Sequence, residues 1–206
     1  MNHVRTGRLA GIVAAAVLAV VLLSMLTGCG NKSEKSTPTG DTAQAYIPVA
    51  RSALSTMAPD AKLLLVQMAD ATTPTSTPVW VYLFGSPKSD KTYVVYVDQG
   101  NAMPATEYGT AGLSADEWKK VPSEDTWKVD SDEAYDKALE ASGAKGDPLA
   151  FFMGLQTYVP ESIAATATVK PYIWYVSFDP GKSGATTSTI EVNAKTGSTK
   201  VAEPTE

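Results

Sequence analysis

The chain has 206 residues, with 17 Lys and Arg against 22 Asp and Glu, a formal net charge of −5, one histidine and one cysteine. Because these two are His3 and Cys29, the rest of the chain has no imidazole and no thiol, which excludes Ser–His–Asp and Cys–His catalysis and metal sites built on His or Cys. The acidic balance and the single arginine after residue 28, Arg51, also argue against binding of nucleic acid or anionic lipid headgroups.

The amino terminus has the pattern of a secretory signal. Arg5 and Arg8, with no acidic residue, precede an apolar run over residues 9–26. A run of this length is also long enough to span a bilayer without being cleaved. The residues at its end therefore decide what kind of segment it is.

The apolar run ends in Leu26-Thr27-Gly28-Cys29, which resembles the lipobox of bacterial lipoproteins. The resemblance implies cleavage between Gly28 and Cys29, a diacylglycerol on the Cys29 thiol, and a new amine that can be acylated. Two or three acyl chains hold a protein durably in a bilayer, because each buried methylene contributes about 0.8 kcal/mol. We therefore predict a signal peptide over residues 1–28 and a lipid anchor at Cys29 in the cell membrane. An uncleaved helix and an ordinary signal peptide are the alternatives, and both also place the remaining chain outside the cytoplasm.

Residues 29–43 are predicted to be a flexible tether between the anchor and the folded part. Their central portion, GNKSEKSTPTGDT, has no apolar side chain and cannot bury enough surface to offset the entropy lost on ordering. The alternative is an irregular but ordered arm. The last residues, 202–206, are expected to fray.

The folded part is predicted to consist of two α+β units with the same order of elements, a helix and three strands. In the first unit, residues 44–101, an apolar stripe after Pro48 predicts the helix. In the second unit, residues 127–202, Asp130 and Glu133 form a capping-box pattern at the helix start. The strands are expected at residues 62–68, 78–84 and 92–97, and at 163–169, 172–178 and 188–194.

The two predicted hairpins share a pattern. Trp80 and Phe84 lie on one face of the first, as Trp174 and Phe178 do in the second. Repetition of a whole unit indicates an internal duplication. The predicted core comprises Trp80, Phe84, Leu139, Trp174, Phe178 and Val192. A short additional helix is predicted from Asp147 through Leu155, and residues 102–126 are expected to be a connector.

The second unit resembles the PepSY-like domains of secreted and lipid-anchored bacterial proteins. The resemblance rests on three stretches: residues 127–134 (WKVDSDEA), 174–178 (WYVSF) and 192–197 (VNAKTG). The first unit matches less well, since residues 97–101 (VDQGN) lack the Thr-Gly ending. The resemblance implies a helix packed on an antiparallel sheet, as in cystatin-like folds, and a role in binding or inhibiting peptidases or other envelope proteins.

Two motifs that point to chemistry have plainer interpretations. Gly181-Lys182-Ser183 resembles the end of a phosphate-binding loop, but Val176 stands where that loop needs a glycine, so we predict a hairpin turn. The densest acidic stretch is interleaved with lysines and lacks calcium-loop spacing, which favours a solvated linker and helix start. Its members are Asp116, Glu117, Glu124, Asp125, Asp130, Asp132, Glu133 and Asp136.

Trp118 and Trp127 lie outside the repeated strands and are either aromatic residues of a binding surface or packing between the units. No residue is predicted to be catalytic, and no cofactor or metal site is predicted. The sequence thus indicates a lipid-anchored, non-catalytic binding, inhibitory or regulatory module for an envelope protein or peptidase. The alternatives are an envelope enzyme that uses carboxylates alone, which needs two of them about 5–10 Å apart, and a carrier of a small ligand.

Overall fold

The computed structural model describes residues 41–69, 78–144, 150–160, 166–178 and 189–202. The predicted signal peptide, Gly28 and Cys29 and the turn at residues 179–184 lie outside these ranges. The helices are α2 (Ile47–Leu54), α3 (Ala115–Lys120) and α4 (Ser131–Ser142), with a one-turn 3-10 helix η2 (Glu124–Thr126). The strands are β1 (Lys62–Met68), β2 (Trp80–Ser86), β3 (Lys91–Asp98), β4 (Asn101–Ala102), β5 (Thr106–Thr110), β6 (Ala150–Val159), β7 (Thr168–Phe178), β8 (Thr189–Asn193) and β9 (Thr199–Val201).

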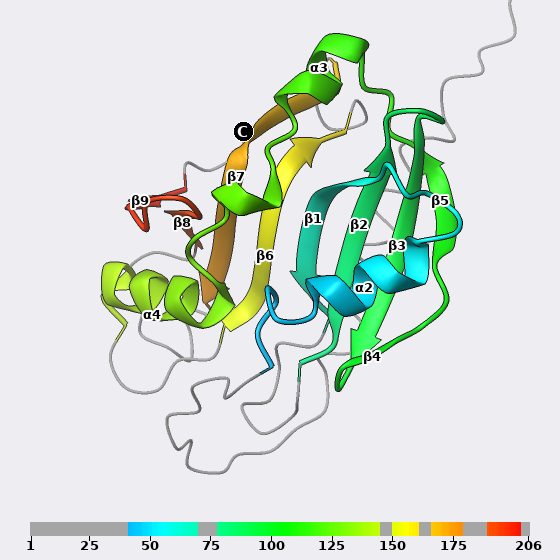
Figure 1. Ribbon diagram of the computed structural model, residues 1–206. Coiled ribbons are helices and arrows are strands. Elements are labelled where there is room, and N and C mark those ends of the chain that lie inside the picture. Colours follow the sequence, from blue (N-terminus) through cyan, green and yellow to red (C-terminus); the bar gives the residue numbers. More distant parts are fainter. Residues whose placement is uncertain (1–40, 70–77, 145–149, 161–165, 179–188, 203–206) are drawn as a thin grey trace, which may run out of the picture.

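All nine strands form a single antiparallel sheet, which confirms the α+β class (Figure 1). Its order is β4-β3-β2-β1-β6-β7-β8-β9. Strand β5 also pairs with β3, on the edge of β3 that faces away from β2. The two halves of the chain meet where β1 pairs with β6. The regions predicted as separate units therefore share one sheet and one main core.

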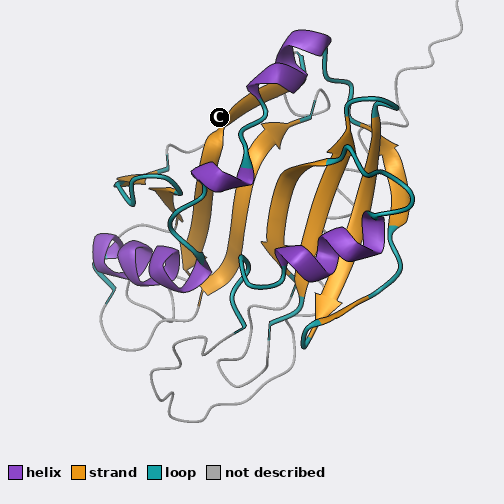
Figure 2. Ribbon diagram, viewed as in Figure 1, coloured by secondary structure: helices purple, strands orange, loops and turns teal. Residues whose placement is uncertain are grey.

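One face of the sheet, the inner face, is packed against α2 and α4 (Figure 2). Helix α2 directs Ile47, Ala50 and Leu54 into the core, and α4 contributes Ala134 and Ala138. Of the predicted core, Trp80, Phe84, Trp174, Phe178 and Val192 are at most 1% exposed, which confirms them. Leu139 is only partly buried, because α4 turns Ala138 rather than Leu139 toward the sheet.

Helix α4 begins where the sequence predicts, with one difference in its hydrogen bonds. The Asp130 carboxylate accepts from the backbone N–H of Ser131 at 2.7 Å and of Gln44 at 3.0 Å, and not from the third residue of the helix as a capping box requires. Gly143, with φ of 67°, ends the helix in the left-handed conformation that glycine adopts without strain.

The helix predicted from Asp147 through Leu155 is wrong from Ala150 onward, where the chain forms β6 between β1 and β7, while residues 147–149 lie outside the described part. Met153 and Leu155 alternate into the core, while Gly154 and Gln156 point away from it. A central strand satisfies its backbone through distant partners, and such tertiary pairing overrides a short local helix signal.

The strand predicted at residues 163–169 is also placed differently. Residues 161–165 lie outside the described part, and Thr168 and Val169 already belong to β7, which continues through Pro171 to Phe178. The proline is accommodated because the register with β6 shifts between Gln156 and Tyr158, so Pro171 faces an irregularity rather than a regular ladder.

The predicted connector at residues 102–126 contributes structure of its own, namely β5, α3 and η2. It is tied to the first half by Arg51, whose guanidinium forms a two-pronged ion pair with Glu124 and donates to the Ala61 carbonyl at 2.9 Å. The same guanidinium lies 5.2 Å from the centre of the Phe84 ring. The tether prediction is also too long at its end, since Ala43 is fully buried.

Candidate functional site

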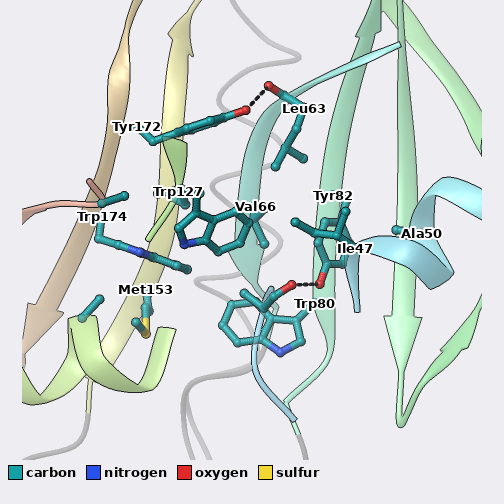
Figure 3. Close-up of a cluster of buried hydrophobic side chains, with 14 of the residues drawn as sticks. Ile47, Ala50, Leu63, Val66, Trp80, Tyr82, Trp127, Met153, Tyr172 and Trp174 are labelled. Atoms are coloured by element: carbon teal, nitrogen blue, oxygen red, sulfur yellow. Dashed lines mark hydrogen bonds between the residues drawn. The ribbon is translucent and has the colours of Figure 1, made fainter. Parts of the chain in front are cut away.

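The two tryptophans predicted as a candidate binding surface lie in the interior. Trp127 is 1% exposed and Trp118 is 6% exposed, so neither is available to an external partner and the packing interpretation holds. The Trp127 ring packs edge-on against the Trp174 ring, with 5.6 Å between the ring centres, and its centre lies 6.4 Å from that of the Tyr172 ring (Figure 3). Its indole N–H donates to the Val129 carbonyl at 2.7 Å.

Trp118 belongs to a second, smaller cluster on the opposite side of the sheet from Trp127. Leu64 and Leu83 point away from the main core and pack into this cluster. The Trp118 ring fills the space above Gly85, where an added Cβ atom would lie 2.6 Å from the ring. Residues of α3 therefore close one end of the outer face of the sheet.

The turn after β8 has a specific backbone structure. The Asn193 side-chain oxygen accepts from the backbone N–H groups of Lys195 and Thr196, at 2.9 and 3.0 Å. Gly197 follows with φ of 72°, a conformation that favours glycine. The Ala194 carbonyl accepts from the N–H groups of both Lys128 and Val129 at 2.8 Å. This stretch thus both turns the chain and holds the segment that precedes α4.

A hollow of about 420 Å³ lies between this turn, the start of β7 and the segment from α3 to η2. Its lining residues are Lys120, Pro122, Thr126, Val169, Lys170, Pro171, Tyr172, Asn193, Lys195 and Thr196. Three of them are lysines and none is acidic. In a chain with an excess of acidic residues, this is a local concentration of positive charge.

Tyr172 joins the hollow to the core. Its hydroxyl donates to the Leu63 carbonyl at 3.0 Å, an interaction drawn in Figure 3. Burial, together with the nearby Glu124, raises the pKa of Tyr172 well above the usual value for a phenol. The hydroxyl is therefore a fixed, neutral donor rather than an acid at ordinary pH.

On the outer face of the sheet, register partners on seven strands form a row that Gly154, which has no side chain, interrupts. Val81 lies between the inward-facing Trp80 and Tyr82 and so points outward, and its register neighbours follow the same rule. In order across the sheet the row consists of Tyr96, Val81, Gln67, Gly154, Tyr175, Glu191 and Lys200. It begins at an exposed aromatic residue and ends in an ion pair of 2.8 Å between Glu191 and Lys200.

Large apolar side chains are exposed beside the first end of this row. Tyr96, Met103 and Tyr108 are 44%, 52% and 45% exposed. Strand β5, which carries Tyr108, pairs with β3, which carries Tyr96, and the Met103 N–H donates to the Tyr96 carbonyl at 2.8 Å. Burial and the nearby Tyr96 raise the pKa of Tyr108. Among the described strands β5 pairs only with β3, so its other edge has no strand partner there.

Several of the acidic residues singled out in the sequence form ion pairs with basic side chains. Within the described ranges, no group of three or more acidic, His or Cys side chains could hold a metal ion. Asp116 and Glu117 instead form ion pairs with Lys119 and Lys120 along α3, and Glu124 pairs with Arg51. In the same part of the chain no helix is both long and apolar enough to cross a bilayer.

The sequence analysis missed the lysine-lined hollow. Lys120, Lys170 and Lys195 are separated by tens of residues and each resembles any other surface lysine in its local sequence. The pairing of β7 with β8 brings Lys170 near the turn that carries Lys195, and the hydrogen bond from the Val169 N–H to Glu117 holds α3, with Lys120, beside β7. Net charge, a property of the whole chain, carries no signal of such a patch.

Comparisons of this chain with protein-family models, with curated proteins and with solved structures found no match.

Proposed function

We propose that the chain is a lipid-anchored, extracytoplasmic binding module without catalytic activity, built from two PepSY-like units, whose partner is an envelope protein or peptidase. The sequence Leu26-Thr27-Gly28-Cys29 supports the anchor. The absence of imidazole and thiol groups after Cys29 agrees with a role in binding rather than in nucleophilic catalysis.

The order of elements supports the duplication. A helix followed by three antiparallel strands occurs as α2-β1-β2-β3 and again as α4-β6-β7-β8, and the first strands of the two sets pair with each other. Trp80 and Trp174 occupy matching positions on the middle strands, and their rings meet edge-on at 6.5 Å in the core. Because β1 and β6 are the first strands of the two repeats and pair with each other, neither leaves a long unpaired strand edge where the repeats meet.

The observation that carries the binding role is the aromatic patch on the outer face, formed by Tyr96, Met103 and Tyr108. Tyrosine and methionine are enriched at protein–protein interfaces, because they bury much area on contact and, for tyrosine, keep a polar tip. The unpaired edge of β5 beside the patch could accept an extended segment of a partner as an additional strand. We therefore place the partner on this part of the molecule.

A photo-crosslinking amino acid at position 108, in the full-length chain in the cells that produce it, tests this role. The matched control is position 57, because Met57 is 50% exposed and follows α2, which packs on the opposite face of the sheet. We expect one crosslinked envelope protein from position 108 and none of the same species from position 57. Equal crosslinking from both positions, or none from position 108, would contradict the proposed binding surface.

The anchor is tested by the substitution Cys29→Ser. Without the thiol, the diacylglycerol has no attachment point, so incorporation of labelled fatty acid should stop. A variant that still incorporates the label would show that the lipid is carried elsewhere.

A further inference from the structure

The lysine-lined hollow has features of a ligand site that the proposed protein-binding role does not use. Its volume of about 420 Å³ falls within the range of roughly 300–1,000 Å³ typical of small-molecule sites. Its lining combines the apolar side chains of Pro122, Val169 and Pro171 with polar and cationic residues. This combination suits a small organic molecule with a charged end.

The three lysines differ in how far their charge is already neutralised. Lys120 forms an ion pair with Glu117, whose other carboxylate oxygen accepts from the Val169 N–H at 3.1 Å. Lys170 and Lys195 are exposed, and neither forms an ion pair with a residue in the described ranges. Of the three lysines that line the hollow, two therefore have no ion-pair partner in the described part of the chain, and the charge of the third is partly compensated.

Several neutral polar groups that line the hollow already have hydrogen-bond partners. The Asn193 side-chain oxygen is occupied by two backbone N–H groups, which leaves its amide N–H₂ as a donor. The Thr126 hydroxyl donates to the Ser123 carbonyl at 2.7 Å. The donors still available are thus mainly cationic. No described residue that lines the hollow is acidic, and the nearest carboxylate, Glu117, is held by Lys120 and the Val169 N–H.

We propose that this hollow binds a phosphate monoester, a small organic dianion. Two unpaired ammonium groups match the two negative charges of a monoester better than the single charge of a phosphodiester or carboxylate, and lysine is a common phosphate ligand in proteins. The proline and valine side chains would contact the organic part of the molecule. This binding does not depend on the proposed protein partner.

Isothermal titration of the full-length chain in nonionic detergent with three soluble probes tests the proposal. Glycerol 3-phosphate is the monoester, glycerophosphoglycerol represents the diester of a lipid headgroup, and glycerol is the neutral control. We expect saturable binding of the monoester, weaker binding of the diester and none of glycerol. The proposal is overturned if the monoester shows no saturation up to about 10 mM. Binding of the diester at least as tight as that of the monoester would instead assign the hollow to lipid headgroups.

Variants locate the binding. The double substitution Lys170→Gln and Lys195→Gln should weaken monoester binding about tenfold or more, because it removes both free charges. Lys88→Gln with Lys91→Gln removes the same charge in the hairpin between β2 and β3 and should leave the affinity unchanged. Equal weakening by both double variants would show a non-specific effect of net charge and would overturn the site.

The substitution Glu117→Gln should strengthen binding of the monoester rather than weaken it. The amide oxygen keeps an acceptor for the Val169 N–H but releases Lys120 from its ion pair. Binding of glycerol 3-phosphate should therefore become tighter. Unchanged or weaker binding in this variant would contradict the role of Lys120 in the site.

Discussion

The indole N–H groups of Trp127 and Trp174 donate to the same acceptor, the carbonyl oxygen of Val129, at 2.7 and 2.8 Å. Trp127 comes from the segment before α4 and Trp174 from the middle of β7. Their shared acceptor fixes the entry to α4 against the centre of the sheet. Both rings are at most 1% exposed, so this arrangement is part of the core.

Replacement of Trp127 should therefore be costly even though the residue lies outside the regular elements. We expect Trp127→Phe to lower the free energy of unfolding by about 2 kcal/mol, because it removes ring volume and one buried hydrogen bond while Trp174 still satisfies the carbonyl. Urea denaturation followed by circular dichroism measures the change. A loss below about 0.5 kcal/mol would mean that Trp127 is not packed as described.

Asp130 is predicted to stabilise more than its own helix. Its carboxylate accepts from Ser131 at the start of α4 and from Gln44 at the start of the folded part. We expect Asp130→Ala to cost about 1–2 kcal/mol in unfolding free energy and Asp130→Asn to cost less, since the amide keeps an acceptor oxygen. Asp136→Ala, at an exposed position of the same helix, is the control and should be near neutral. Similar losses for Asp130→Ala and the control would refute the capping role.

Gly85 and Trp118 should be energetically coupled. A Cβ atom at residue 85 would lie 2.6 Å from the Trp118 ring and 2.7 Å from the Leu64 side chain, so Gly85→Ala should destabilise by about 1–3 kcal/mol through overpacking. Trp118→Leu removes the ring that the new methyl group meets. In a double-mutant cycle, the cost of Gly85→Ala should be smaller in the Trp118→Leu background. Strict additivity would show that the two side chains do not compete for the same space.

Alkaline pH should destabilise the fold through its buried phenols. Burial and a hydrogen bond with Asp41 raise the pKa of Tyr46 to about 12, and burial raises the pKa of Tyr82 and Tyr172. In the unfolded chain these groups lose their protons near pH 10, so the folded state binds more protons above that pH. Their contribution is complete below about pH 10 and is lost as the pH rises beyond it.

The free energy of unfolding can be measured by denaturation between about pH 8 and about pH 11. The contribution of these phenols to it should be constant up to about pH 10 and should then fall. Tyr82→Phe removes one such phenol. The variant should lose some stability at every pH, because the Ala43 carbonyl loses its donor, but its decline above about pH 10 should be shallower. An unchanged slope would exclude Tyr82 from the alkaline transition.

The strands with two-residue periodicity could be predicted from sequence because their pattern is local. Trp80 and Phe84, and likewise Trp174 and Phe178, alternate with outward-facing residues, and the core they form follows directly. Strand β6 could not be predicted in the same way. Its strand conformation depends on pairing with β1, about 90 residues earlier in the chain, and no local pattern records that contact.

The surface features likewise divide into those that a local sequence pattern predicts and those that depend on distant contacts. Trp118 and Trp127 were ambiguous because an isolated aromatic residue has the same sequence signature on a surface and in a core. The lysine-lined hollow arises where α3, β7 and the turn after β8 meet, and no local sequence pattern records that meeting. The lipobox is different in kind, because a processing signal is read in the unfolded chain and its information is contained in four consecutive residues.

The most direct test of the account is the mass of the amino-terminal peptide of the mature protein, isolated from membranes of the cells that produce it and measured by mass spectrometry. The account predicts a peptide that begins at Cys29 and carries the additional mass of a diacylglycerol. A peptide with unmodified Cys29, or one that retains residues before Cys29, would contradict the lipid anchor and with it the proposed place of the protein in the cell envelope.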